Sequence, residues 1–177
     1  MTFLTLQESA RFVGKICYVE LQLFSVLAEK SSTADTPYEK VFFASASAAH
    51  AWRSRQLFEL LPVSVGLPNR DELIQSFDPD FDGLLLWTEA EAPSALLAIL
   101  LQAIYPTLLL VYETRLEICE YPADAAAKRV FQRVTQDLKA ILAEGNRLPS
   151  AVSVGQSAAD VGERIVTLLR QLRPAKL

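Results

Sequence analysis

The amino-acid sequence predicts an all-α protein in which four long helices pack side by side, with a long connection between the second and the third. Three observations carry this prediction. Apolar residues recur every three or four positions over several long stretches. A segment rich in Pro, Gly, Asn and Asp separates two pairs of such stretches. The 177 residues include 6 Gly and 9 Pro, and 51% are hydrophobic and 21% charged, which favours one globular domain over residues 1–177 rather than a disordered or loop-rich β chain.

The first helix is predicted over residues 6–32. Two neighbouring lines of side chains run along it with spacings of three and four, which makes a wide apolar face. One line is Phe12, Ile16, Val19, Leu23 and Val26, and the other is Val13, Cys17, Glu20, Phe24 and Leu27. The second helix is predicted to begin near Asp35 or Thr36, because Pro37 suits a first helical turn, and to end before Pro62.

The third helix follows a long connection over residues 62–87, within which residues 70–77 are predicted to form a short helix. Clusters of Pro, Gly, Asn and Asp mark this connection as a loop that crosses between two helical pairs. The third helix is predicted to start near Thr88 or Ser94 and to reach Glu120.

The centre of the third helix, residues 94–113, is apolar nearly all round and is close to the length that spans a membrane. However, Gln102, Pro106 and Thr107 interrupt the apolar run, and amphipathic helices flank it. These features favour a buried central helix over a transmembrane one. Since Pro106 lacks a backbone N–H, we expect it to kink the helix or to force a bulge.

The fourth helix is predicted over residues 123–145, with Gly145 as its C-cap. A last amphipathic helix is predicted over residues 157–173. Its apolar side is formed by Val161, Ile165, Leu168 and Leu172. The links within each helical pair are short, whereas the crossover between the pairs is long. A four-helix bundle with one long crossover and an extra C-terminal helix has a ferritin-like architecture.

Ferritin-like bundles hold two metal ions with a Glu from each of two helices and a Glu-x-x-His motif from each of the other two. In this chain Glu20 lies on an apolar line, so its carboxylate is predicted to face inward. His50, the sole histidine, is predicted to face inward on the second helix, but Ser47 stands where the motif requires Glu. The third helix offers Glu113 and Glu117, and the fourth has no histidine.

This ligand count predicts that no di-iron centre forms, because two metal ions would keep too much uncompensated positive charge. Two alternatives stay open. Glu20 and His50 pair with each other in the core, since a buried carboxylate needs a partner. Alternatively, Glu20, His50 and Glu113 hold a single, weakly bound ion. Glu113 is equally expected as an exposed charge that pairs with a nearby Arg or Lys.

The first helical pair, "YVELQLFSVLAEKSS" with "EKVFFASASAAHAWRSRQLFELL", resembles the ferritin-like proteins of actinobacteria that are related to tRNA hydroxylases. Those enzymes are di-iron proteins that hydroxylate the isopentenyl group of a methylthio-adenosine in tRNA. The residues that fit the family's pattern are Tyr18, Glu20, Leu27, Ala28, His50 and Trp52. Ser47 departs from it, and the ligand motif of the fourth helix is absent. The resemblance covers the first half of the chain and implies the fold, while its departures fall on the metal ligands.

From these observations we expect a ferritin-like bundle that has lost the usual di-iron ligands and acts as a non-catalytic binding or scaffolding protein without a cofactor. The alternative is a metal-dependent oxidoreductase or tRNA hydroxylase-like enzyme with an atypical site for iron or another single metal ion. A third hypothesis is a small-ligand binder whose pocket is lined by Phe24, Tyr105 and Tyr112; otherwise both tyrosines are expected to pack in the core.

Composition and the N-terminal residues bear on partners and location, and they predict a cytoplasmic homodimer. The net charge of −4 does not favour nucleic acid as a partner, although tRNA stays open. Cys17 and Cys119 have no metal-binding spacing and are expected as reduced core residues. The first residues do not form a signal peptide, and no membrane is expected. The extent of apolar helix surface favours a homodimer. Arg53, Arg55 and Arg115 are expected on solvated faces.

Overall fold

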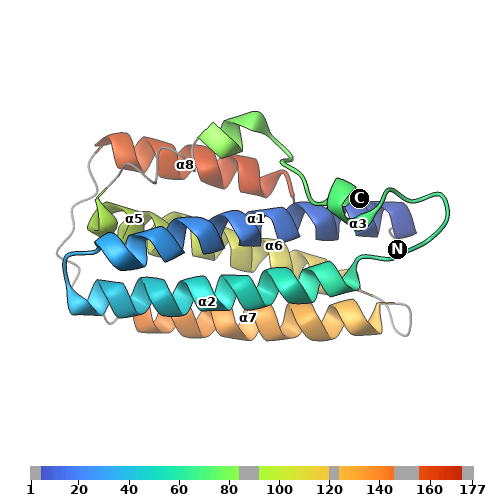
Figure 1. The fold of residues 1–177 in the computed structure, drawn as a ribbon, viewed down its shortest axis with the longest axis horizontal. Helices are drawn as coiled ribbons and strands as arrows, with labels where there is room; N and C mark the ends of the chain where they lie inside the picture. Colours follow the sequence, from blue (N-terminus) through green and yellow to red (C-terminus); the bar gives the residue numbers. More distant parts are fainter. Residues whose placement is uncertain (1–4, 84–91, 120–123, 146–155, 173–177) are drawn as a thin grey trace.

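The protein is described by a computed structural model that covers residues 5–83, 92–119, 124–145 and 156–172 (Figure 1). These residues contain helices and no strand, so the predicted all-α class is confirmed for them. The helices are α1 (Leu6–Thr33), α2 (Pro37–Leu60), α3 (Arg70–Leu73), α5 (Pro93–Ile99), the π-helical segment η1 (Leu100–Ile104), α6 (Tyr105–Glu117), α7 (Ala125–Gly145) and α8 (Gln156–Arg170). Residues 79–83 are also helical.

The long helices lie side by side (Figure 1). α1 and α2 form an antiparallel pair with extensive contact, and α7 packs against both α2 and α6. The helix made of α5, η1 and α6 runs in the same direction as α2, and α7 returns in the opposite direction. α8 packs along α5, η1 and α6. This order places α1, α2, α6 and α7 around one apolar core that also takes in the buried side of α8.

Local sequence signals explain where the first two helices begin. Thr5 and Thr36 are N-caps, and each accepts a hydrogen bond from the backbone N–H of a Glu three residues later, Glu8 and Glu39. Each Glu side chain accepts a hydrogen bond from the backbone of its cap residue, which completes a capping box. The predicted start of the second helix at Thr36 and Pro37 is therefore confirmed.

The expected disturbance at Pro106 takes the form of the π-helical turn η1. The backbone N–H of Tyr105 donates to the carbonyl of Leu100, five residues earlier. Pro106 has no N–H to donate, so a regular α-helical ladder cannot pass through this point. The helix from Pro93 to Glu117 is long and apolar enough to cross a membrane, yet half of its most apolar stretch is buried inside the protein.

The connection after α2 lies along α1, and its helix α3 is shorter than the predicted residues 70–77. Tyr18 of α1 donates a hydrogen bond to Asp82, with 2.7 Å between Oη and Oδ1. The α-carbon of Gly14 lies so close to α3 that a β-carbon there would overlap the backbone carbonyl of Leu73. The rest of the predicted crossover, residues 84–87, lies outside the described residues, as do Thr88 and Glu120.

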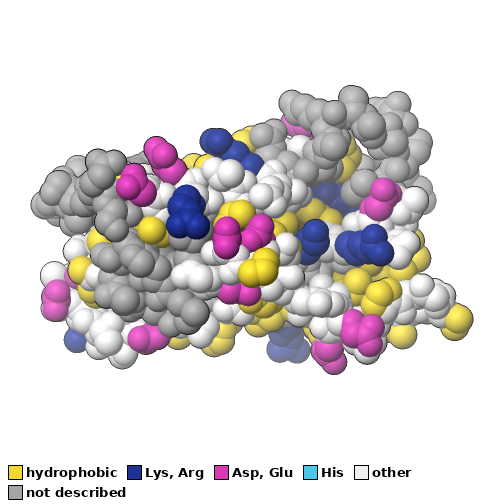
Figure 2. Space-filling model, turned by 90° about the horizontal axis from the view of Figure 1, so that it is seen from above, with side chains coloured by type: hydrophobic (Ala, Val, Ile, Leu, Met, Phe, Trp, Pro, Cys, Tyr) yellow, Lys and Arg dark blue, Asp and Glu magenta, His cyan; other side chains and the backbone are white. Residues whose placement is uncertain are grey.

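On the face seen in Figure 2, acidic and basic side chains are interspersed among the described residues rather than segregated.

Both cysteines are buried and unbridged, as expected. Gly145 is the last residue of α7 and packs against Leu101. Residues 146–155 lie outside the described part of the chain, so the role of Gly145 as a C-cap stays a prediction.

Candidate functional site

A buried polar cluster lies in the core where α1, α2 and α6 meet. We call it the Glu20 cluster; it consists of Glu20, His50, Arg53, Tyr105 and Tyr112, each of which has an exposed fraction of 0%. Polar side chains of this kind are costly to bury unless they bond to one another. The contacts within the cluster therefore decide what it can do.

Glu20 is the centre of the cluster, because both of its carboxylate oxygens accept hydrogen bonds. Nδ1 of His50 lies 2.5 Å from Oε2, and Oη of Tyr112 lies 2.7 Å from Oε1. The 2.7 Å bond from the Tyr112 hydroxyl has the length that is typical of a hydroxyl facing an ionised carboxylate. The contact between Glu20 and His50 that the sequence predicted is present.

His50 links Glu20 to a second tyrosine. Its Nε2 lies 3.3 Å from Oη of Tyr105, and the two rings are stacked with centroids 5.7 Å apart. Since Nδ1 faces a carboxylate, which only accepts, Nδ1 carries the proton, and Nε2 is the acceptor for the Tyr105 hydroxyl. A neutral imidazole therefore satisfies both contacts.

Arg53 supplies a positive charge beside Glu20. Its Nη1 lies 3.8 Å from Oε2 of Glu20, which is an ion-pair distance and longer than a hydrogen bond. Among the described residues, none of the three guanidinium nitrogens of Arg53 has a hydrogen-bond partner. The sequence-based expectation that Arg53 lies on a solvated face is wrong, since the side chain is fully buried.

The ionisation states follow from these contacts. Burial alone raises the pKa of Glu20, but the charges and hydrogen bonds around it outweigh burial and hold its pKa below the ordinary value. Burial lowers the pKa of His50, with the neighbouring Glu20 only partly offsetting it. Burial raises the pKa of Tyr105 and Tyr112. The cluster therefore holds one carboxylate and one guanidinium, with neutral imidazole and phenols, and is electrically balanced.

Helical spacing explains how the cluster assembles. Tyr105 and Tyr112 are seven residues apart on α6, so they share the face that points at α1 and α2. His50 and Arg53 are three residues apart on α2 and share its inner face in the same way. Ser47, one turn before His50, donates a hydrogen bond to the carbonyl of Phe24 (3.0 Å) rather than contacting Glu20.

Glu113, the third candidate ligand, lies apart from Glu20 and His50. Its side chain is 38% exposed and forms an ion pair with Lys139 of α7, with 2.7 Å between Oε1 and Nζ. Of the two roles that the sequence left open for Glu113, metal ligand or exposed charge paired with a nearby Arg or Lys, the structure shows the second. Glu117 is exposed.

The residues of the cluster do not fit a di-iron centre. Glu20 is its one carboxylate, and both oxygens of Glu20 already serve side-chain donors. His50 has no free ring nitrogen, because Nε2 accepts from Tyr105. A metal ion near Glu20 would also be repelled by the Arg53 guanidinium, which stays charged in proteins. Within the part of the chain that the structure describes, no three His, Cys, Asp or Glu side chains are grouped so that they could hold a metal ion.

The hypothesis of a ligand pocket at Phe24, Tyr105 and Tyr112 is wrong. Phe24 is 39% exposed on the outer side of α1, whereas both tyrosines are fully buried.

A second arginine, Arg115, was also expected at the surface but is buried. Its Nη2 donates to Oγ of Ser9 at 2.7 Å, and its guanidinium lies over the Phe12 ring.

Comparison with known proteins adds no relative: no protein-family model, no curated protein and no solved structure matches this chain.

Proposed function

We propose that this protein is a ferritin-like four-helix bundle that has lost the usual di-iron ligands and acts as a non-catalytic binding or scaffolding protein. The single observation that supports this proposal most is the Arg53–Glu20 ion pair. In a metal-binding bundle, the metal ions balance the charge of the buried carboxylates. Here a guanidinium of the chain itself lies beside the buried carboxylate of Glu20, so the Glu20 cluster is electrically balanced without a metal ion.

The closed nature of the cluster also favours a structural role. Its five side chains are fully buried. Neither the cavity between α2 and α7 nor the groove between η1 and α8 is lined by a residue of the cluster. A reacting group must be reachable by its substrate, and these two openings do not lead to Glu20 or His50.

The direction of the helices supports the ferritin-like part of the proposal. α2 and the α5–α6 helix run the same way (Figure 1), so a long crossover must join them. The described part of the connection lies along α1.

The decisive experiment is metal analysis. The protein is expressed with iron supplied and purified without chelator, and metal per chain is measured for the wild type and for Glu20→Gln. We expect a metal content near zero in both. About two irons per chain, with oxygen consumption on reduction, would contradict the proposal and favour the hydroxylase-like alternative. A single ion that is present in the wild type and absent in Glu20→Gln would favour the alternative of an atypical site.

We also propose that the protein is a cytoplasmic homodimer. Several large apolar side chains of α1 and α2 are partly exposed, namely Leu21, Phe24, Val41 and Trp52. Apolar side chains gathered on neighbouring helices are typical of interaction surfaces. Light scattering coupled to size-exclusion chromatography measures the mass in solution. A mass equal to one 19.6 kDa chain at every concentration tested would exclude the dimer.

A further inference from the structure

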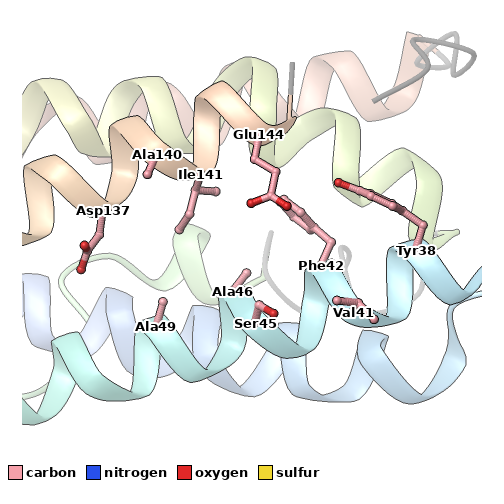
Figure 3. Close-up of a pocket in the computed structure, with 10 residues that line it drawn as sticks. All are labelled: Tyr38, Val41, Phe42, Ser45, Ala46, Ala49, Asp137, Ala140, Ile141 and Glu144. Atoms are coloured by element: carbon pink, nitrogen blue, oxygen red, sulfur yellow. The ribbon is translucent and has the colours of Figure 1, made fainter. Parts of the chain in front are cut away.

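A cavity of about 270 Å³ opens between α2 and α7, away from the Glu20 cluster (Figure 3). It exists because small side chains stand where the two helices face each other: Ala46 and Ala49 on α2, and Ala140 on α7. Phe42 and Ile141 add apolar walls. This volume lies just below the range of roughly 300–1,000 Å³ that is typical of sites for drug-sized ligands, so a small molecule is the matching size.

The two ends of the cavity carry negative charge. Both carboxylates come from α7: Glu144 lies at the end near Tyr38, and Asp137 lies farther along the helix (Figure 3). The side chains of Tyr38 and Glu144 extend toward each other across the opening. Partial burial, together with the nearby Glu144 charge, raises the pKa of Tyr38. Within the described residues, Asp137 pairs with Arg133 of its own helix at 3.2 Å, whereas Glu144 has no ion pair.

The spacing of the two carboxylates selects the length of a ligand. Asp137 and Glu144 are seven residues apart, which is two helical turns and about 10.5 Å along the axis. An ammonium group lies roughly 3 Å from a carboxylate that it contacts. The two ammonium groups of a bridging ligand would therefore be about 4.5 Å apart on the line between the carboxylates, and farther apart when they lie beside that line in the cavity. An extended diamine of four or five carbons spans about 6–7.5 Å between its nitrogens, which suits the second arrangement.

We propose that the cavity between α2 and α7 binds a linear aliphatic diamine of four or five carbons. One ammonium group contacts Glu144 and the hydroxyl of Tyr38, and the other contacts Asp137, where it competes with Arg133. The methylene chain packs on Ala46, Ala49 and Ile141. These apolar side chains offer no hydrogen bond to a charged group, but burial of a hydrocarbon chain against them is favourable. The inference goes beyond the proposed function and does not depend on it, because diamine binding and metal content are measured separately.

The test is calorimetric titration of the full chain with 1,4-diaminobutane at an ionic strength of about 0.02 M, where exposed charges are weakly screened. Butylamine keeps one ammonium group and 1,4-butanediol keeps none. We expect the diamine to bind at least about fivefold more tightly than butylamine, and the diol not to bind, because each charged contact adds affinity. Equal affinities for the diamine and butylamine would overturn the proposal, and so would the absence of binding by the diamine.

Variants separate this site from general attraction to an acidic protein. Glu144→Gln should weaken diamine binding by about tenfold, which corresponds to one charged contact. Asp137→Asn should weaken it less, because Arg133 already occupies part of that carboxylate. Ala49→Leu should abolish binding by filling the cavity while every charge stays in place. Glu29→Gln is the control, since this exposed glutamate of α1 is not part of the cavity. Equal losses in Glu29→Gln and Glu144→Gln would overturn the proposal.

Discussion

Nη1 of Arg53 lies 3.8 Å from Oε2 of Glu20, and both side chains are completely buried. Arg53 brings a permanent charge into the core, and no hydrogen bond to its guanidinium nitrogens is present among the described residues. Its electrostatic contact with Glu20 is therefore its principal compensation. Conversely, the contacts of His50, Arg53 and Tyr112 with Glu20 together hold the pKa of its carboxyl below the ordinary value and keep it ionised.

The first prediction concerns the loss of this cation. Arg53→Met should lower the free energy of unfolding by about 3–5 kcal/mol, because it leaves a buried carboxylate without its counter-charge. The measurement is urea-induced unfolding at pH 7. Arg55→Met is the matched control: Arg55 lies on the same helix with its side chain 78% exposed and pairs with Glu59, so its loss should change the free energy by no more than about 0.5 kcal/mol.

A double variant makes the same prediction sharper. Adding Glu20→Gln to Arg53→Met removes the orphaned charge, so the double variant should be more stable than Arg53→Met alone. If Arg53→Met costs no more than Arg55→Met, or if the second substitution only adds to the loss, Arg53 does not stabilise the core by balancing the charge of Glu20.

The second prediction concerns pH. Burial lowers the pKa of His50 below its ordinary value of 6.5. Below pH 6.5 the unfolded chain therefore binds a proton at His50 that the folded chain does not bind, and the folded state loses stability as the pH falls. The free energy of unfolding should therefore decrease between about pH 6.5 and 5.5, with a slope that cannot exceed about 1.4 kcal/mol per pH unit for one proton.

The chain allows a clean assignment of this slope, because His50 is its sole histidine. The free energy of unfolding is measured by urea at a series of pH values for the wild type and for His50→Gln. The variant should show a flat profile in this window. A wild-type stability that increases as the pH falls from 6.5 would show that His50 is protonated in the folded protein. At lower pH, the lowered pKa of Glu20 acts in the same direction, since its stabilising charge is lost as the pH falls below 4.5.

Periodicity predicted the helices and the Glu20–His50 contact, because both depend on which side of a helix a residue occupies. Val13, Cys17 and Glu20 of the first helix and His50 of the second point inward in the structure, as predicted. The same spacing could have identified Arg53, which lies three residues after His50. A surface position was predicted for Arg53 instead, because arginine is seldom fully buried.

Other parts of the site could not be predicted from periodicity alone. Glu113 follows Tyr112 directly, so it lies about 100° around the helix from the core-facing tyrosine. Whether it pointed to Glu20 or to Lys139 depended on how α6 is rotated against α7. The π-helical turn before Tyr105 affects that rotation, and sequence spacing gives no measure of it. The approach of α3 to Gly14 depends likewise on the path of a long connection.

The third prediction separates the two tyrosines of the cluster. Tyr112→Phe removes a 2.7 Å bond to an ionised carboxylate and should cost about 1.5–3 kcal/mol of unfolding free energy. Tyr105→Phe removes a longer bond, 3.3 Å, to a neutral imidazole and should cost about 1 kcal/mol or less. Urea unfolding of both variants at pH 7 compares them directly. A larger loss in Tyr105→Phe would mean that His50, rather than Glu20, is the charged centre of the cluster.

The fourth prediction uses two glycines that both lie inside helices. A β-carbon at Gly14 would overlap the backbone carbonyl of Leu73, which cannot rotate away as a side chain can. Gly14→Ala should therefore lower the free energy of unfolding by about 1–3 kcal/mol, because α3 must move off α1.

At Gly162 of α8 the nearest atoms to a β-carbon are 3.6 Å away, an ordinary contact. Gly162→Ala should thus stabilise the protein by about 0.5–1 kcal/mol, since Ala restricts the unfolded chain more than Gly. Thermal or urea unfolding measures both changes. If Gly14→Ala stabilises the protein as much as Gly162→Ala does, the connection between α2 and α5 does not pack on α1 in the way described.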